Sequence, residues 1–571
     1  MDIAIFVNLL VDYLAGVLAV SVKTVQTHRM HVMDKLNTHG RTNLMKHAIR
    51  PGVALRKALG VIARQQGRGL AGSDVSVNNS CDVVRSVRNR CNTMWELKRA
   101  RYRTLLNRRK RSIPDHSIER SWDWLKCNYD WLVRDVPGMG RGLGAGFEDY
   151  PWWFGCDATY AVLGALALGQ QQCVIETLDL LRSVSAATNG DTGRVIHECT
   201  TQGEIINPGC VQETPHFVQA IWQTFRWTGD LSFLKRNYGF CKRGLLDWTL
   251  GTCCPDGDVL PYGFGITERP GLDLQCVDTA AQTVRALSAM ADMADVVGEP
   301  RVAEHCRALA VNAGTHLNQA FWMEHEGLYG DMLATPVEMI PRLRQWLSAT
   351  PDIYYQAGVS GSTGAYLNGL LCQAESAAEP HRKQPWLLKH WSIVAPLESH
   401  LAPVDRARRT LDRLESEEFT GPHGMYLNGL DRTNSMSINT GALAMAEVTY
   451  GRVERGLEYI RLLTATLDSH MPGAISEMSP AVGCFVQAWS GYAIAWPLVT
   501  QVFGVQPDAH QRVLDLRAQF PQAWPQAHLD GVHIGDNSFN FHWDGETLHV
   551  TAHKPGWSIK PSTVPVVAHG F

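Results

Sequence analysis

Long amphipathic segments recur through most of this chain, and their repetition restricts the possible fold more than any other feature. In ETPHFVQAIWQTFRWTGD, Phe217, Ile221 and Phe225 recur every four residues, which places them on one face of an α-helix. Similar segments lie around residues 116–134, 157–170, 173–187, 213–228, 231–250, 277–297, 299–320, 362–377, 404–417, 435–450, 454–469 and 486–503. About six successive helix pairs predict an all-α solenoid or a closed toroid.

The loops between these helix pairs are rich in Gly, Pro, Trp, His and carboxylates. A closed ring of helices would gather alternate loops at one mouth. Because loops on a rigid scaffold commonly hold binding and catalytic residues, we look for a functional site there.

Five segments carry a resemblance to a known family. They read EDYPWWFGCDATYAVLGALALG, NGDTGRVIHECTTQGEIINPG, QETPHFVQAIWQTFRWTGDLSFL, DGDVLPYGFGITERPGLDLQCVDTAAQTVRALSAMADMA and ISEMSPAVGCFVQAWS. In this order they resemble the motifs of (α/α)6-barrel glycoside hydrolases of the glycogen-debranching and amylo-α-1,6-glucosidase group, with glucoamylases as relatives. The resemblance covers about residues 114–503 and implies a mainly α protein with an (α/α)6 catalytic barrel there.

The last motif contains Glu477 among small and apolar residues. A carboxylate in such surroundings is either a structural strut or a group with a shifted pKa. The resemblance implies that Glu477 is the general base that activates water. It also makes Trp489, within QAWS, a candidate for substrate binding.

The second carboxyl group that such a mechanism needs is expected in the loop DGDVLPYGFGITERPGLD. Two residues compete for the role of general acid. Glu268 lies where the family's acid falls when the loop is counted back from the next helix, whereas Asp273 has the GLD context of trehalase-like and processing-glucosidase relatives. We favour Glu268 and keep Asp273 as the alternative.

Other loop residues are candidates for holding the sugar. Asp157 matches an aspartate that binds sugar hydroxyls in relatives, although this chain has Cys156 where relatives often have Arg. Trp152 and Trp153 are candidate stacking surfaces. Weaker candidates on the neighbouring loops are His197, Glu198, Gln212 and Glu213.

The N-terminal region differs from the rest in charge, since residues 1–113 hold 21 Lys or Arg against 6 Asp or Glu. Within it, SVKTVQTHRMHVMDKLNTHGRTNLMKHAIR (residues 21–50) resembles the second half of the helix-turn-helix of LuxR-type regulators, which implies a small helical segment over residues 1–52. That resemblance implies DNA contacts from Lys23, Thr24, Thr27, His28 and Lys35. The upstream residues imitate the family's supporting helices only loosely, so a nonfunctional remnant is the competing interpretation. Residues 53–113 are interpreted as a basic linker or remnant.

The tail, residues 504–571, alternates apolar residues on both sides of a DG turn, at Phe539, Phe541 and Trp543 and again at Leu548 and Val550. This pattern predicts a β-hairpin in a small β region.

The rest of the sequence narrows the function. The fourteen Cys are scattered and show no disulfide-framework or zinc-ribbon spacing, which favours reduced thiols. Because no signal peptide or membrane span is recognised, we expect a cytoplasmic protein. HECTTQ at His197 lacks the second His of a zinc helix, and GMGRGLGAGF does not complete a dinucleotide motif, so we expect neither metal nor cofactor.

These features together predict an inverting, exo-acting glycoside hydrolase that cleaves α-glucosidic or related bonds in oligosaccharides by general acid/base catalysis. Two alternatives remain open: a sugar-responsive DNA-binding regulator, and a catalytically inactive sugar-binding barrel.

Overall fold

The structure is a computed structural model that describes residues 111–571 except 269, 349–360 and 561. The chain divides into two units, Met1–Arg108 and Arg109–Phe571, and the description below concerns the second. The helix-turn-helix and linker predictions lie outside the described residues.

Six helices of this unit contact one another in a closed succession. Helix α7 packs against α9, α9 against α11, α11 against α15, α15 against α17, α17 against α19, and α19 against α7. Their bounds are α7 (Gly155–Ala167), α9 (Glu213–Thr228), α11 (Val277–Val297), α15 (Ala395–Glu398, after a 3-10 turn η2, Trp391–Val394), α17 (Ser437–Thr449) and α19 (Ser490–Pro497, continued by a π-helical turn η3, Leu498–Val502).

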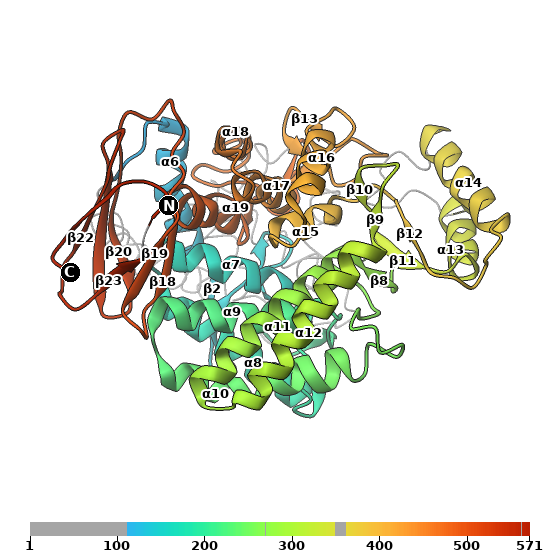
Figure 1. The fold of residues 1–571 in the computed structure, drawn as a ribbon, viewed down its shortest axis with the longest axis horizontal. Helices are drawn as coiled ribbons and strands as arrows, with labels where there is room; N and C mark the ends of the chain where they lie inside the picture. Colours follow the sequence, from blue (N-terminus) through green and yellow to red (C-terminus); the bar gives the residue numbers. More distant parts are fainter. Residues whose placement is uncertain (1–110, 269, 349–360, 561) are drawn as a thin grey trace, which may run out of the picture. The chain divides into compact units, whose positions relative to one another are not determined.

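A second set of helices lies outside this succession. Several of them pack on a member of the inner set that is near in sequence, as α8 does on α7, α12 on α11 and α18 on α17; Figure 1 shows α11 and α12 side by side. The outer helices are α6 (His116–Leu132), α8 (Gln171–Asn189), α10 (Leu231–Lys242, continued by η1, Arg243–Leu250), α12 (Pro300–Ala320), α16 (Val404–Leu414) and α18 (Val453–Thr464).

The burial of the two sets explains their positions. Outer helix α12 buries one stripe, Ala303, Cys306, Ala310, Ala313 and Leu317, at the three- and four-residue spacing of one helix face. Inner helix α17 is buried along nearly its whole length, as expected of a helix covered on all sides. The amphipathic segments of the sequence therefore predicted most helix positions within a few residues.

Glycines let α19 approach both of its neighbours closely. A Cβ added at Gly164 of α7 would lie 2.4 Å from the backbone of Gly491 in α19. One added at Gly441 of α17 would lie 2.4 Å from Ala493. Side chains at these positions would force the helices apart and open the succession where α19 meets α7 and α17.

A hairpin of two further helices, α13 (Pro336–Ser348) and α14 (Gly361–Glu375), was predicted only in part. It has its own apolar cluster, which includes Leu343, Trp346 and Leu367. The sequence analysis missed α13 because Pro341 lies inside it, and proline is disfavoured within helices.

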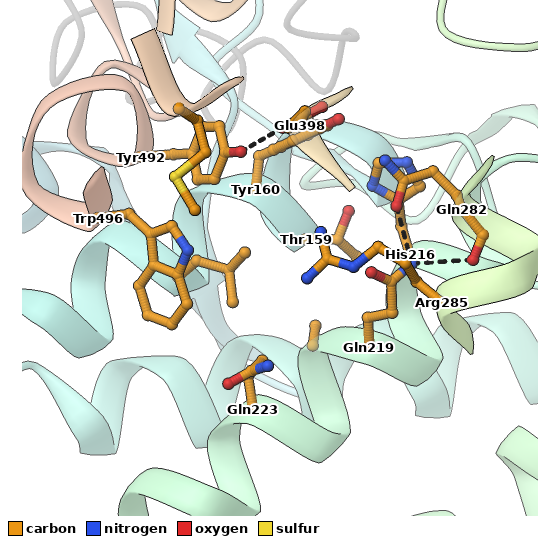
Figure 2. Close-up of a pocket in the computed structure, with 13 residues that line it drawn as sticks. Thr159, Tyr160, His216, Gln219, Gln223, Gln282, Arg285, Glu398, Tyr492 and Trp496 are labelled. Carbon is orange, nitrogen blue, oxygen red and sulfur yellow. Dashed lines mark hydrogen bonds between the residues drawn. The ribbon is translucent and has the colours of Figure 1, made fainter. Parts of the chain in front are cut away.

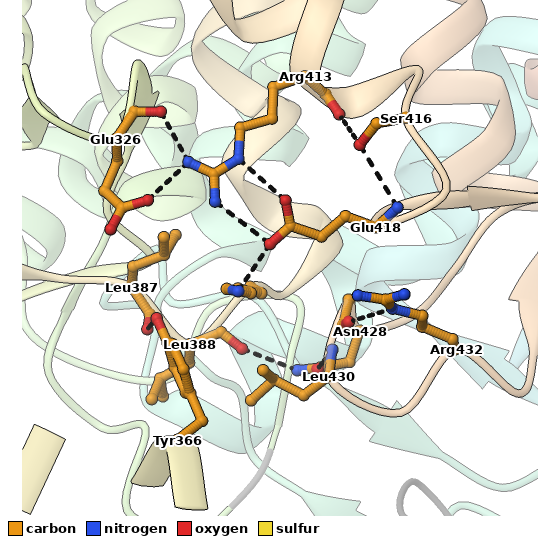
Figure 3. Close-up of polar contacts among 12 residues, drawn as sticks. Glu326, Tyr366, Leu387, Leu388, Arg413, Ser416, Glu418, Asn428, Leu430 and Arg432 are labelled. Carbon is orange, nitrogen blue, oxygen red and sulfur yellow. Dashed lines mark hydrogen bonds and ion pairs between the residues drawn. The ribbon is translucent and has the colours of Figure 1, made fainter. Parts of the chain in front are cut away.

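Ion pairs join the segments beside this hairpin, and one cation–π contact reaches its helix α14 (Figure 3). Arg413 of α16 donates to Glu326 at 2.6 Å and to Glu418 at 3.0 Å. Lys389 pairs with Glu418 at 2.6 Å and lies 4.6 Å from the ring centre of Tyr366 in α14. These groups are all partly shielded from water, so we interpret the cluster as a structural anchor.

The tail forms the predicted hairpin within a larger β region. Strand β21 (Asn537–Trp543) alternates buried and half-buried residues and pairs with β22 (Leu548–Ala552) across the turn at Asp544. One sheet has the order β1-β20-β21-β22-β24 and a second has the order β18-β19-β23. Their other strands are β1 (Arg111–Ser112), β18 (Val505–Asp508), β19 (Val513–Leu516), β20 (Ala527–Ile534), β23 (Ser558–Lys560) and β24 (Val566–His569).

Short strands also pair the loops between helices, which the sequence analysis did not predict. The remaining sheets join β2 with β3, β4 with β17, β9 with β10, β13 with β14, β15 with β16, β5 with β6 and β7, and β8 with β11 and β12. The strands are β2 (Val133–Val136), β3 (Gly140–Leu143), β4 (Gly146–Phe147), β5 (Trp153–Phe154), β6 (Glu198–Cys199), β7 (Ile205–Asn207), β8 (Gln275–Cys276), β9 (Trp322–Met323), β10 (Leu328–Tyr329), β11 (Met332–Ala334), β12 (Gln384–Trp386), β13 (Thr420–Gly421), β14 (Gly424–Met425), β15 (Ser435–Met436), β16 (Met478–Ser479) and β17 (Val486–Gln487). The described part is therefore mainly helical, with paired loops that hold side chains in fixed places.

Candidate active site

Glu477 lies in a loop that folds back on itself before α19. The backbone N–H of Glu477 donates to the carbonyl of Cys484, and the N–H of Cys484 donates to Glu477 Oε2, both at 2.8 Å. Gly483 has a φ of +54°, and a Cβ there would lie 2.4 Å from Glu477 Oε2. The sequence Gly-Cys after Glu477 therefore allows the chain to wrap closely around this carboxylate.

The surroundings of Glu477 favour its protonated form. Burial raises its pKa to about 7, the N–H of Cys484 opposes this shift, and the charge of Asp149 adds to it. A carboxyl group with such a pKa is partly ionised at neutral pH and can accept a proton there.

Asp157 joins the first motif to the last. It lies in the first turn of α7 and accepts a hydrogen bond from Gln487 Nε2 at 2.7 Å. Strands β4 and β17 pair next to it, with Gln487 opposite Gly146. Burial, with the charge of Glu477 as the next cause, raises the pKa of Asp157 to about 7. Asp157 and Glu477 therefore lie within electrostatic reach of each other although 320 positions separate them.

Glu268 belongs to a polar cluster beside them. Its Oε1 lies 2.9 Å from Nδ1 of His197 and accepts a hydrogen bond from Gln212 Nε2 at 3.4 Å. The same His197 nitrogen lies 2.7 Å from Glu213 Oε1. Burial favours neutral His197, but hydrogen bonds and charge from Glu213 and Glu268 outweigh burial and raise the pKa of His197, which favours its imidazolium form.

Glu268 is more open to water than Glu477, which is half-buried. About 31% of the Glu268 side chain is exposed, whereas its neighbour Glu213 is completely buried. Burial among neighbouring groups nevertheless raises the pKa of Glu268, and His197 opposes that shift. Glu268 also contributes to the raised pKa of Asp157, which places it within electrostatic reach of that residue.

The loop that carries Glu268 is fixed by the start of α11. The N–H of Ile266 donates to Asp278 Oδ2 at 2.7 Å, and Asp278 lies in the first turn of that helix. Gly263, with φ +144°, lies against Val211, where a Cβ would come within 2.1 Å of the valine side chain. These contacts hold the loop against the start of α9, where Gln212 and Glu213 lie.

Asp273 is not part of this cluster. Its Oδ1 pairs with Arg342 of α13 at 3.0 Å, and about half of its side chain is exposed. Arg342 also donates to the carbonyl of Gly271. Asp273 therefore anchors its loop to α13.

The tryptophans are less available than expected. Trp153 is completely buried and its indole N–H donates to the carbonyl of Gly142, so it serves packing and has no face for a sugar. Trp152 and Trp489 are 4% and 8% exposed. Trp152 donates to Glu198 at 2.8 Å, which gives Glu198 a structural partner.

Tyr150 is the exposed aromatic residue beside these tryptophans. It is 42% exposed and makes edge contacts with Trp152 and Phe154. Phe154 in turn contacts the ring of His197. Tyr150 is therefore a better candidate for stacking on a ligand than Trp153.

Sequence reasoning missed four residues of this region: Asp149, Tyr150, Cys210 and Gln487. Asp149 and Tyr150 stand directly before Pro151-Trp152-Trp153, and Gln487 begins QAWS. These three residues lie inside the motifs already singled out, so the motifs could have identified them. Cys210 had no such signal. Its thiol joins His197, Glu213 and Glu268, and their candidate ligand atoms all lie within 4.8 Å of one another, which is suited to a metal ion.

A separate small pocket lies among the inner helices, with Glu398, Tyr492, Trp496, Gln219 and Arg285 around it (Figure 2). Its volume is about 30 Å³, enough for about two water molecules and far below that of ordinary ligand pockets. Tyr492 donates to Glu398 within it. We therefore look for substrate at the loops and not in this pocket.

Solved structures similar in fold to this chain include two glycoside hydrolases. A GH78 family rhamnosidase of Bacillus sp. GL1 matches with a TM-score of 0.51 and 15% identity, covering 81% of this chain and 44% of that one. A sialidase matches with a TM-score of 0.55 and 10% identity, covering 78% of this chain and 39% of that one. This chain thus spans less than half the length of either protein.

Sequence comparisons add one short match. Residues 12–48 match the model for bacterial regulatory proteins of the luxR family, beginning upstream of the resemblance at residues 21–50. The five predicted DNA-facing residues fall within the match and lie outside the described structure. No curated protein sequence gives a significant match to the chain.

Within the described residues, no helix has the length and apolar character needed to cross a membrane.

Proposed function

We propose that this chain is a glycoside hydrolase whose active site lies at the loops that hold Asp157, Glu268 and Glu477. The observation that carries the proposal is their convergence: they come from α7, the loop before α11 and the loop before α19. The pKa of Asp157 is raised by burial, and the charges of Glu477 and Glu268 add to that shift. Buried carboxyl groups that perturb one another are typical of catalytic sites. The likeness in fold to a rhamnosidase and a sialidase supports this choice.

The proposed mechanism is inversion. Glu477 accepts a proton from water, which attacks the anomeric carbon, while Glu268 donates a proton to the leaving glycosidic oxygen. The enclosed position of Glu477 suits a base that meets one water molecule, and the partly exposed Glu268 suits an acid at the leaving-group side. Asp157, held by Gln487, is proposed to accept hydrogen bonds from the sugar hydroxyls.

We further propose that the closed helix succession is an (α/α)6 toroid spanning about residues 114–503. The proposed domains around it are a partial helix-turn-helix at residues 1–52, a basic linker or remnant at 53–113 and a small β region at 504–571. Outer helix α6 would complete the sixth pair, because it packs against α19.

All twelve cysteines of the described part are free, which supports the proposed cytoplasmic location.

The substrate class is proposed from the sequence resemblance and from the structural neighbours. The family resemblance favours an exo-acting enzyme on α-glucosides, and the two structural neighbours add rhamnosides and sialosides. The test is a panel of aryl glycosides, glycosyl fluorides and oligosaccharides of these sugars, with Glu477→Gln as the control protein. We expect turnover of at least one sugar class by the native chain only. Equal rates for the native chain and Glu477→Gln, or binding of a sugar without turnover, would contradict the proposal and favour an inactive sugar-binding barrel.

The luxR-family match favours a second candidate, a sugar-responsive DNA-binding regulator. This candidate predicts that the full chain binds random-sequence DNA and that its affinity falls steeply as the salt concentration rises. Lys23→Ala with Lys35→Ala should weaken this binding. DNA binding that changes when a sugar is added would support the regulator over the hydrolase alone.

A further inference from the structure

The cluster around His197 contains side chains that the proposed hydrolysis does not use and that are common metal ligands. His197, Cys210, Glu213 and Glu268 offer one nitrogen, one sulfur and two carboxylate oxygens, with all four ligand atoms within 4.8 Å of one another. We propose that these four residues form a binding site for Zn²⁺ or a similar divalent transition metal ion.

The spacing of the four groups fits a tetrahedral ion. Zn²⁺ holds nitrogen, oxygen and sulfur ligands at about 2.0–2.3 Å, so tetrahedral ligands lie roughly 3.3–3.8 Å apart. Nδ1 of His197 is 2.7 Å from Glu213 Oε1 and 2.9 Å from Glu268 Oε1. All four ligand atoms lie within 4.8 Å of one another, a limit that is about 1 Å above the tetrahedral value. Adjustments of about 1 Å at side chains would therefore place an ion at the centre, with loss of the His197 proton to solvent.

An unsatisfied atom provides an independent observation. Glu213 is completely buried, and its Oε2 has no hydrogen-bond partner among the described residues. A buried carboxylate oxygen without a partner is costly, and a cation beside it would remove that cost. The orphaned oxygen belongs to one of the four proposed ligands.

The surrounding residues fix these ligands in place. Asn207 Nδ2 lies 3.6 Å from the sulfur of Cys210, and Gln212 Nε2 lies 3.4 Å from Glu268 Oε1. The carbonyl of His197 accepts from the N–H of Gly155 at 2.8 Å. Such outer hydrogen bonds are typical of metal sites. Glu268, with 31% of its side chain exposed, opens a path from solvent.

The ion would also oppose the proposed catalysis. A Glu268 carboxylate bound to Zn²⁺ cannot carry the proton for the leaving group, so added Zn²⁺ would inhibit hydrolysis. This consequence rests on the proposed function, whereas binding of the ion does not. The test therefore measures binding without substrate.

The experiment is a titration of the metal-free full chain with Co²⁺, followed by absorption. A tetrahedral Co²⁺ bound by a thiolate gives an intense visible band and a sulfur-to-metal charge-transfer band in the near ultraviolet. We expect both bands to saturate at one equivalent and to disappear when Zn²⁺ is added. Absence of the charge-transfer band in the native chain at one equivalent would overturn the proposal.

Variants assign the site. Cys210→Ser should abolish the charge-transfer band, and Glu213→Gln should weaken Co²⁺ affinity by about 10-fold or more while the band remains at saturation. Cys372→Ser, which changes an exposed thiol, and the double variant Cys81→Ser/Cys91→Ser serve as controls that should keep the band. Far-ultraviolet circular dichroism and the melting temperature check that each variant is folded. Loss of the band in a control, or its persistence in folded Cys210→Ser, would place the metal elsewhere.

Discussion

The two loops that present Glu477 and Glu268 hold their carboxylates in different ways. Glu477 is enclosed by its own loop, with a backbone N–H from Cys484 on its Oε2 and glycine where a side chain would collide. Glu268 is held by side chains of other loops, His197 and Gln212, and part of it faces water.

This difference in environment suits two different catalytic roles, general base and general acid. A base that activates water works best in a fixed, enclosed position, because misplacement of the attacking oxygen slows the reaction. An acid must meet leaving groups of different sizes and must regain its proton after each turnover, which access to water permits. On this comparison we propose that the residue with the backbone cradle is the base and that the residue in the open network is the acid.

The largest expected effect is that of removing the base. Glu477→Gln should lower turnover by about 10²–10⁴-fold on every substrate, because water needs deprotonation in each reaction. Steady-state kinetics on a natural glycoside and on a glycosyl fluoride provide the measurement. A large loss on only one of the two substrates would break the comparison.

The second effect depends on the leaving group. Glu268→Gln should lower turnover on natural glycosides by about 10²–10⁴-fold but far less on a glycosyl fluoride, whose leaving group needs little protonation. Asp273→Asn is the matched control, and it should keep near-native rates because Asp273 pairs with Arg342 away from the cluster. Loss of activity in Asp273→Asn with full activity in Glu268→Gln would exchange the two roles.

A smaller effect is expected in the pH profile. Burial raises the pKa of Glu477 to about 7, and a base must be ionised, so the rising limb of the kcat/KM profile should have its midpoint near pH 7. Glu268 must be protonated to act as the acid, so kcat/KM should fall again at higher pH, where Glu268 loses its proton. Asp149→Asn removes a negative charge that contributes to this shift, so the rising limb should move to lower pH. Asp273→Asn should leave the limb unmoved, and an unchanged limb in Asp149→Asn would contradict the electrostatic account.

No loss of activity is expected from metal removal. Prolonged treatment with EDTA should not lower hydrolysis, since both proposed proton transfers use carboxyl groups of the chain itself, and it should raise hydrolysis to the extent that an ion occupies the His197 cluster. Loss of turnover that Zn²⁺ restores would make the His197 cluster part of the reaction and would remove Glu268 from the role of acid.

The sequence predicted the helices well because burial repeats along them, as Ala303, Cys306 and Ala310 show in α12. It missed α13, where Pro341 interrupts the usual helical preference, and the two-residue strands of the loops, which are too short for a periodic pattern. Those strands depend on tertiary pairing, as between Gly146 and Gln487.

For the site, sequence motifs indicated candidate residues but not the distances between them. The proximity of Asp157 and Glu477 depends on α19 packing against α7, which no local pattern encodes. The side chain of Trp153 fills the core whereas Tyr150 stays exposed, and this difference in burial depends on tertiary packing that no local pattern encodes. Cys210 was missed because its partners lie at 197, 213 and 268, too far apart in sequence for a motif.

The most direct test of the central claim is the anomeric configuration of the first product. Proton NMR of a glycosyl fluoride of the preferred sugar, recorded before mutarotation, shows which anomer is released. The account predicts the inverted anomer, because Glu477 directs water to the face opposite the leaving group assisted by Glu268. Release of the retained anomer would show that a carboxylate attacks the sugar itself, and the assignment of Glu477 as a base for water would then be wrong.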